Sequence, residues 1–194
     1  MTKNAAYLWL LISILSCISC GQDYTPKPRG YFKIDFPKKA YQHYKSDCPF
    51  TFDYPVYAEI EPDFSRDAKP CWINVHFPEY KGRIHLSYQP ITSQKIFNEL
   101  IEDARKLAFK HTVKATGINE ARIAYPDKRV YGIYYTIEGN TASWAQFFLT
   151  DSSKNYVRGA LYFNESPRLD SIQPVLDFVK KDVDVFIKSF KWKK

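Results

Sequence analysis

The chain has 194 residues, of which 45% are hydrophobic and 17% are aromatic, and its formal net charge is +7. This composition excludes an intrinsically disordered chain, and the length suits one globular domain with a sizeable core. Basic residues cluster at 27–33, 37–45 and 188–194. Such clusters indicate attraction to anionic lipid or to an acidic partner, or else solvated ends and edges of the fold.

Residues 1–19 have the pattern of a lipoprotein signal peptide. A positively charged start, with Lys3, precedes an uncharged and largely apolar run over residues 5–18. This run is shorter than the about 20 apolar residues that a membrane-spanning helix needs. Cys20 follows a small residue at the end of the run and precedes a polar stretch, so we expect it to be the lipidated first residue of the mature protein. Cys17 is the alternative lipidation site, although it lies inside the apolar run.

The C-x-x-C spacing of Cys17 and Cys20 also occurs in redox and zinc sites. A redox pair of this kind opens a helix after a buried strand, and a zinc site needs further ligands at a matching spacing. Here the segment is expected to be cleaved away, and the other two cysteines provide no second pair. We therefore expect an exported protein, for which nucleic acid is not a partner.

Cys48 and Cys71 remain after the signal peptide is removed. An exported protein enters an oxidising compartment, in which an even number of cysteines is typical of disulfides. The sequence therefore predicts a Cys48–Cys71 disulfide, whose closed loop would add about 3 kcal/mol to the free energy of unfolding. Two buried free thiols are the alternative.

Residues 20–30 contain two prolines among polar and basic residues and are expected to form a lipidated tether. One globular domain then occupies residues 31–194. Alternation of apolar and polar residues, bounded by turn residues, predicts its strands. The expected strands cover residues 31–36, 50–54, 72–77, 83–88, 117–125, 129–138, 143–150 and 156–163.

Two segments have helical periodicity instead. Residues 93–111 place their apolar residues on one face, and Ser93 or the threonine before it is expected to cap this helix. A second helix is expected to be capped by Asp170 or Ser171, with Pro174 in its first turn. One helix between two sets of strands and one near the end predict an α+β fold, in which an antiparallel β-sheet is flanked by two main helices.

The sequence carries no strong signal of catalysis or of metal binding. It contains no nucleophile elbow, no zinc-protease motif and no glycine-rich phosphate loop. The four histidines have no ligand spacing, although His76 and His85 alternate with apolar residues on adjacent strands and are expected to share a sheet face. We therefore expect no catalytic residue, no metal site and no cofactor.

The connection between the strands at 129–138 and 143–150 is a candidate contact site. It brings together four polar residues, which are Glu138, Asn140, Thr141 and Ser143. Binding of a protein partner is one interpretation. Ordinary turn chemistry is the other, because glycine and asparagine tolerate positive φ, while threonine and serine bond locally.

Several long blocks of unusual composition follow the signal peptide. They are YTPKPRGYFKIDFP, CPFTFDYP, CW, HLSY, LIEDARKLAFKHTVKA, VYGIYYTIEGNTASWAQFFLTDSS, VRGALYF and SFKWK. In this order they resemble the gliding motility lipoprotein GldD family of Bacteroidetes. The resemblance implies an envelope lipoprotein, required for gliding and for the associated type IX protein secretion, with its lipid on Cys20 and with Cys48 and Cys71 as its core cysteines. It implies no catalytic residues.

The sequence shows two further similarities, one to a known fold and one to a glycosylation motif. The order of strands and helices is similar to the PsbP/Mog1-type α/β/α sandwich, which is a likeness of fold and says nothing of function. Residues 170–172, Asp-Ser-Ile, match the pattern on which Bacteroidetes attach O-glycans to exported proteins. A helix cap is nevertheless the expected role of Ser171.

Together these observations predict a non-catalytic lipoprotein whose domain docks on other gliding and type IX secretion proteins. Acyl chains such as palmitate on Cys20 would hold it to the lipid bilayer. We expect it at the outer membrane, facing the periplasm, with the periplasmic side of the inner membrane as the alternative. The alternative function is that of a small ligand-binding or hydrolytic envelope lipoprotein with a cleft beside the aromatic sheet.

Overall fold

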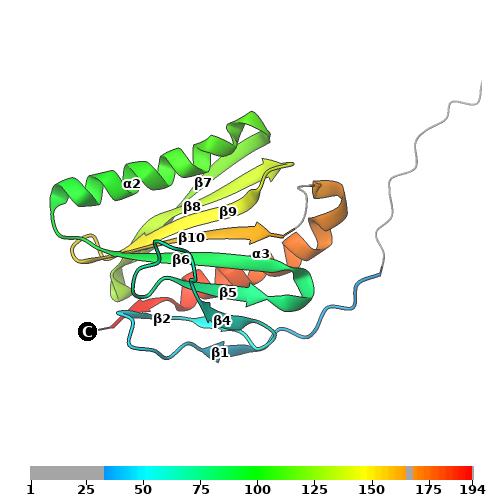
Figure 1. The fold of residues 1–194 in the computed structure, drawn as a ribbon, viewed down its shortest axis with the longest axis horizontal. Helices are drawn as coiled ribbons and strands as arrows, with labels where there is room; N and C mark the ends of the chain where they lie inside the picture. Colours follow the sequence, from blue (N-terminus) through cyan, green and yellow to red (C-terminus); the bar gives the residue numbers. More distant parts are fainter. Residues whose placement is uncertain (1–32, 165–167, 194) are drawn as a thin grey trace, which may run out of the picture. The chain divides into compact units, whose positions relative to one another are not determined.

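The computed structural model describes residues 33–164 and 168–193, and Figure 1 shows their fold. The predicted signal peptide, both N-terminal cysteines and the tether at 20–30 lie outside the described residues. A seven-stranded antiparallel sheet forms the centre, with the strand order β4-β5-β6-β10-β9-β8-β7. Its strands are β4 (Glu59–Pro62), β5 (Ile73–Phe77), β6 (Gly82–Pro90), β7 (Ala115–Tyr125), β8 (Val130–Gly139), β9 (Ser143–Thr150) and β10 (Asn155–Phe163).

The strands β8, β9 and β10 form an antiparallel meander at the middle of the sheet. All eight residues of β9 are buried, because both faces of this strand are covered. Phe147 of β9 lies opposite Gly159 of β10, where a Cβ atom would come within 2.1 Å of the Phe147 ring. Only glycine leaves room for that ring. The strands predicted between residues 72 and 163 are confirmed as β5 to β10, with shifts of one or two residues at their ends.

The helices α2 (Gln94–Phe109) and α3 (Leu169–Ser189) cover opposite faces of the sheet (Figure 1). Successive side chains of a strand point to opposite faces. In β9, the Phe147 ring packs 5.4 Å from the ring of Phe186 on α3, whereas Phe148 joins Ala104 and Ala108 of α2 in a second core cluster. The result is a three-layer α/β/α arrangement, which confirms the predicted α+β class with an antiparallel sheet and two main helices.

Helix α2 begins as the sequence predicts. Ser93 Oγ accepts a hydrogen bond from the N–H of Ile96 at 3.3 Å, which satisfies one of the free donors of the first turn. On the solvent side, Lys106 Nζ lies 3.9 Å from Glu102 Oε1. No helix among the described residues is long and apolar enough to span a membrane.

Helix α3 begins earlier than predicted, at Leu169. Its cap comes from another element, because the Oδ1 atom of Asn140 accepts the N–H of Leu169 at 2.7 Å. A capping side chain must precede the helix, whereas Asp170 and Ser171 already lie in its first turn. The prediction that one of these two residues caps α3 is therefore wrong, and Pro174 lies inside the helix rather than in its first turn.

Short strands near both ends of the domain complete the fold. They are β1 (Tyr41–His43), β2 (Phe50–Thr51), β3 (Asp53–Pro55) and β11 (Lys191–Trp192), in the pairs β1–β3 and β11–β2. The strand predicted at 31–36 is not formed by residues 33–36, where the ring of Phe36 instead stacks 4.3 Å from that of Phe178 on α3. The strand predicted at 50–54 is divided at Phe52, since its two parts pair with different strands.

Candidate functional site

The β8–β9 hairpin holds the four polar residues predicted as a contact site. Glu138 is exposed, and its carboxylate accepts a hydrogen bond from Asn119 Nδ2 at 3.0 Å. Asn140 is also exposed, although its Oδ1 atom is the cap of α3. Both residues lie at the surface, and each already has a partner within the fold.

Thr141 and Ser143, in contrast, are buried, with only 1% and 0% of their surface exposed. Thr141 Oγ1 donates to the carbonyl of Ser143 at 2.9 Å, and Ser143 Oγ donates to that of Ala145 at 3.4 Å. The buried Trp144 ring closes the turn, because its Nε1–H donates to the carbonyl of Gly139 at 2.8 Å. The prediction that all four residues form one contact surface is corrected in this respect, since these two serve the turn itself.

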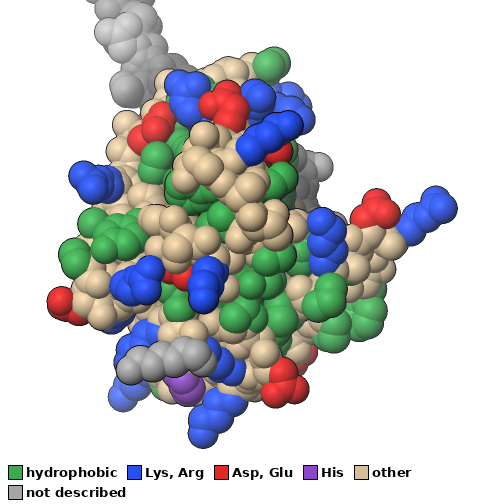
Figure 2. All heavy atoms as spheres, turned by 90° about the vertical axis from the view of Figure 1, so that its left-hand side faces the viewer, with side chains coloured by type: hydrophobic (Ala, Val, Ile, Leu, Met, Phe, Trp, Pro, Cys, Tyr) green, Lys and Arg blue, Asp and Glu red, His purple; other side chains and the backbone are tan. Residues whose placement is uncertain are grey.

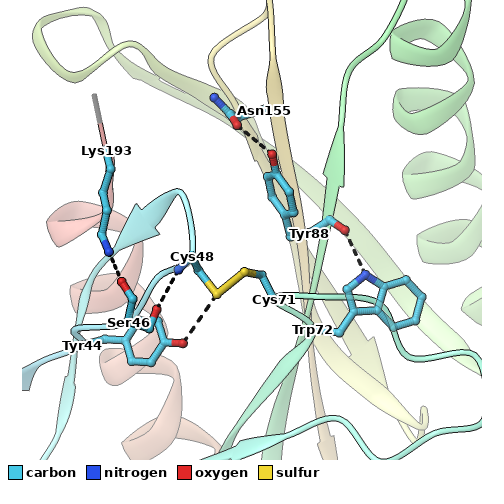
Figure 3. Close-up of a disulfide and its surroundings, with 8 residues drawn as sticks. All are labelled: Tyr44, Ser46, Cys48, Cys71, Trp72, Tyr88, Asn155 and Lys193. Atoms are coloured by element: carbon cyan, nitrogen blue, oxygen red, sulfur yellow. Dashed lines mark hydrogen bonds between the residues drawn. A yellow bond between two sulfur atoms is a disulfide. The ribbon is translucent and has the colours of Figure 1, made fainter.

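Figure 3 shows a disulfide between Cys48 and Cys71, whose Cα atoms lie 5.6 Å apart. It joins the segment before β2 to the segment before β5. Around it, Tyr44 Oη donates to Cys48 Sγ at 3.9 Å, and the N–H of Cys48 donates to Ser46 Oγ at 3.1 Å. The ammonium group of Lys193 donates to the carbonyl of Ser46. The bridged segment therefore also binds Lys193, the residue directly after β11.

His76 and His85 line one cleft of about 360 Å³, together with Arg83 and Tyr162, which confirms that they share a face of the sheet. Burial, and next the charge of Arg83, lower the pKa of His85, so that its ring is neutral at neutral pH. His76 Nδ1 lies 2.9 Å from one carboxylate oxygen of Glu61, and Arg83 donates to the other at 3.2 Å. This network links the strands β4, β5 and β6.

Glu59, Glu61 and His76 bring three potential metal-ligand atoms within 4.8 Å of one another. Carboxylate oxygens and imidazole nitrogens are ligands of divalent cations. Glu61, however, already binds the guanidinium group of Arg83, whose positive charge opposes a cation at the same place. We assign no metal to this cluster.

A buried polar network between the start of the domain and α3 was not predicted from the sequence. Asp182 of α3 is 1% exposed, and its carboxylate accepts hydrogen bonds from Lys39 Nζ at 2.7 and 2.8 Å, from Tyr41 Oη at 3.0 Å and from Tyr57 Oη at 2.6 Å. Lys39 also donates to Tyr57 Oη at 2.6 Å and to the carbonyl of Phe178 at 2.9 Å. Its ammonium group lies 3.2 Å from the centroid of the Phe178 ring, a cation–π contact.

The pKa shifts in this network follow from burial and from Asp182. Burial lowers the pKa of Lys39, against the opposing hydrogen bond and charge of Asp182. Burial and the hydrogen bond to Asp182 raise the pKa of Tyr41 to about 12, and they raise the pKa of Tyr57 further. Both hydroxyl groups therefore stay protonated and donate to the carboxylate. The network links residues 39–41 to α3 through hydrogen bonds. Its donors and acceptors bind one another and do not point to a substrate site.

The family model of the gliding motility lipoprotein GldD matches residues 21–192. The chain belongs to the GldD lipoprotein family. Membership confirms the resemblance seen in the sequence, and it makes the protein an envelope-associated lipoprotein of gliding motility. Among curated proteins, no relative matches this chain.

The chain is also similar to a solved structure, the solution structure of cyanobacterial PsbP (CyanoP) from Synechocystis sp. PCC 6803. The two share 14% sequence identity, with a TM-score of 0.48, over 85% of this chain and 99% of the cyanobacterial one. The α+β class of this domain is given by its own described strands and helices.

Proposed function

We propose that this protein is a non-catalytic, lipid-anchored component of the gliding machinery and of the type IX protein secretion associated with it. Its globular domain docks on other envelope proteins. The observation that carries this proposal is the match to the GldD family model over residues 21–192, which includes almost the whole chain after the predicted signal peptide.

The anchor is the lipidated Cys20, directly before the matched region. Two acyl chains give stable membrane attachment, whereas a single chain gives only weak and reversible binding. We place the domain at the outer membrane, facing the periplasm. The periplasmic side of the inner membrane is the alternative location.

The absence of a catalytic role is supported by how the buried ionisable groups are used. The Asp182 carboxylate is shared among three donors from the start of the domain. Asp151 accepts three main-chain N–H groups and the side chain of Asn155. A general base needs a free acceptor within reach of a substrate proton, and these carboxylates are committed to holding the fold.

Ligand binding is the second candidate function, and one cleft favours it. The cleft has a volume of about 770 Å³ and lies between the start of the domain, the turn before β6 and the first turns of α3. Apolar side chains such as Ile34, Ile172 and Val175 line it beside Tyr80. Its size and lining resemble those of small-molecule sites in general.

Crosslinking in intact cells, followed by purification of the protein and mass spectrometry, tests the proposal. The matched control is the Cys20→Ser variant, which keeps the domain and loses the lipid. We expect the wild type to capture gliding or secretion proteins of the envelope and the variant to lose most of them. Capture of none of these proteins, together with a small molecule bound in native mass spectrometry, would favour ligand binding instead.

A further inference from the structure

A basic groove of about 800 Å³ lies at the end of the domain where β11 is found. One wall is β11 with Lys193, and the other is formed by the β9–β10 connection and the turn between β7 and β8. We define the basic groove by the residues Lys128, Arg129, Lys154, Lys191, Trp192 and Lys193. Figure 2 views this end of the domain and shows Lys and Arg side chains gathered on its lower part, with few Asp and Glu side chains among them.

Among the described residues, the positive charges of the basic groove are not paired with acidic side chains. Within residues 33–164 and 168–193, none of its five cations forms a salt bridge. Those with hydrogen bonds use neutral acceptors: Lys128 donates to the carbonyl of Lys188, Arg129 to Ser153 Oγ at 3.3 Å, and Lys193 to the carbonyl of Ser46. Such bonds orient the side chains without compensating their charge.

Two carboxylates also line the basic groove, Asp127 and Asp151, against the five cations. Asp151 is 9% exposed; its Oδ1 atom accepts three main-chain N–H groups from residues 153–155, and its Oδ2 atom accepts the side-chain amide of Asn155. It stabilises that wall rather than pairing with a lysine across the groove. Positive charge therefore remains in excess, and an anionic ligand is favoured.

The strand β11 has one free edge, which is the second property of the basic groove. Among the described strands, β11 pairs only with β2, and the N–H of Lys193 donates to the carbonyl of Pro49 at 2.8 Å. In an antiparallel pair, the main-chain groups of successive residues point alternately toward and away from the partner strand. Since the N–H of Lys193 faces β2, the N–H and C=O groups of Trp192 point away from β2, and Trp192 is one of the residues that line the groove.

Trp192 is held rigidly at this edge. Its ring makes edge contacts with Phe190 at 4.8 Å and with Phe50 at 6.5 Å, and both of those rings are fully buried. Its Nε1–H is buried and has no hydrogen-bond partner in the described part of the chain. A preformed strand edge costs little ordering when a second strand is added.

We propose that the basic groove binds an extended acidic segment of another envelope protein, which adds as a strand to the free edge of β11. Its main chain pairs with that of Trp192, and its carboxylates lie against Lys154 and Lys191 on the two walls. This proposal names the class of partner for the docking role proposed above. It rests on that docking role and assigns the role to one surface of the domain, the basic groove.

A protein segment suits the basic groove better than a lipid surface does. A strand edge offers main-chain donors and acceptors that a peptide matches and a headgroup layer does not. The described chain also begins at the opposite end of the domain from the groove, as Figure 1 shows. Lys33, the first described residue, thus lies away from the groove.

Binding of a labelled synthetic peptide with alternating Glu and Val residues to the mature lipoprotein, in neutral detergent micelles, tests the proposal. We expect saturable binding that weakens with ionic strength, and protection of the Trp192 amide from hydrogen exchange in the complex. The Lys154→Glu/Lys191→Glu variant should lose affinity about tenfold or more, because two attractive charges become repulsive. The matched control is Lys110→Glu/Lys114→Glu, which makes the same charge change at two exposed lysines outside the groove and should bind like the wild type.

Three results would overturn the proposal. Equal binding of the same peptide with all its main-chain nitrogen atoms methylated, which leaves it no N–H donor, would exclude strand addition. Equal weakening in both charge variants would show only a general charge effect. Binding of phosphatidylglycerol vesicles without any peptide binding would assign the groove to lipid headgroups. These binding measurements are separate from motility, so their failure leaves the gliding role itself open to its own test.

Discussion

The buried network around Asp182 gives the sharpest prediction about what holds this domain together. Replacing Asp182 by Asn removes the charge that Lys39 faces and weakens the acceptor that Tyr41 and Tyr57 share. Removing one member of a buried ion pair typically costs 3–5 kcal/mol, because the other charge is left uncompensated. The Lys39 side chain is 25% exposed, against 1% for Asp182, so water partly screens it. We therefore expect the free energy of unfolding to fall by about 3 kcal/mol, at the lower end of that range.

Urea unfolding of the purified lipoprotein, followed by tryptophan fluorescence, measures this change. The matched control is Asp177→Asn on the exposed side of the same helix, where the carboxylate accepts a hydrogen bond from Gln173. It should change the free energy of unfolding by less than about 0.5 kcal/mol. A double variant, Lys39→Met with Asp182→Asn, should recover part of the loss, since no unpaired charge remains and the asparagine oxygen still accepts hydrogen bonds from Tyr41 and Tyr57. A loss of less than about 1 kcal/mol in Asp182→Asn would show that the pair is solvated rather than buried, contrary to this prediction.

Three further predictions concern the disulfide, Asp151 and the basic groove. In protein purified from the envelope without reductant, Cys48 and Cys71 should give no free thiol, and reduction should lower the free energy of unfolding by about 3 kcal/mol; two labelled thiols before reduction would contradict this. Although burial opposes it, hydrogen bonds from the N–H groups of Lys154, Asn155 and Ser153 lower the pKa of Asp151 from 3.8 to about 2. The ionised Asp151 should therefore add about 2 kcal/mol to the free energy of unfolding, in full above pH 3.8, and this contribution should be lost as the pH falls through about 2. In the Asp151→Asn variant, the free energy of unfolding measured with urea should decrease less over this acid range. In cells, the Lys154→Glu/Lys191→Glu variant should be as abundant as the wild type on immunoblots and should spread less, whereas normal spreading would exclude a need for the groove.

The strands of the central sheet could be predicted because their patterns are long and local. Alternation over β8, β9 and β10, joined by short polar turns, determines a meander without any knowledge of distant residues. The periodicity and Ser93 cap of α2 are likewise local. The short strands could not be predicted in the same way: β4, with exposed Glu59, has no clear alternation, and the division at Phe52 depends on a partner strand about 140 residues later.

The buried network was missed because its members are distant in sequence. One signal was present, since Asp182 interrupts the apolar stripe of α3 between Val179 and Val183, where a charged side chain needs a buried partner. Nothing in the sequence identified Lys39 as that partner. The prediction of a contact site at the hairpin around Asn140 was partly wrong for a similar reason. Its polar composition was clear, but the burial of Thr141 depends on the packing of the neighbouring sheet.

Colony spreading of a deletion strain complemented in turn by the wild type and by Cys20→Ser is the direct test of a lipid-anchored role in gliding. We expect no spreading in the deletion strain, full spreading with the wild type and strongly reduced spreading with Cys20→Ser, at equal abundance of the two proteins on immunoblots. Normal spreading and normal adhesin secretion in the deletion strain would contradict a role in gliding and secretion, and normal spreading with Cys20→Ser would contradict the need for the anchor.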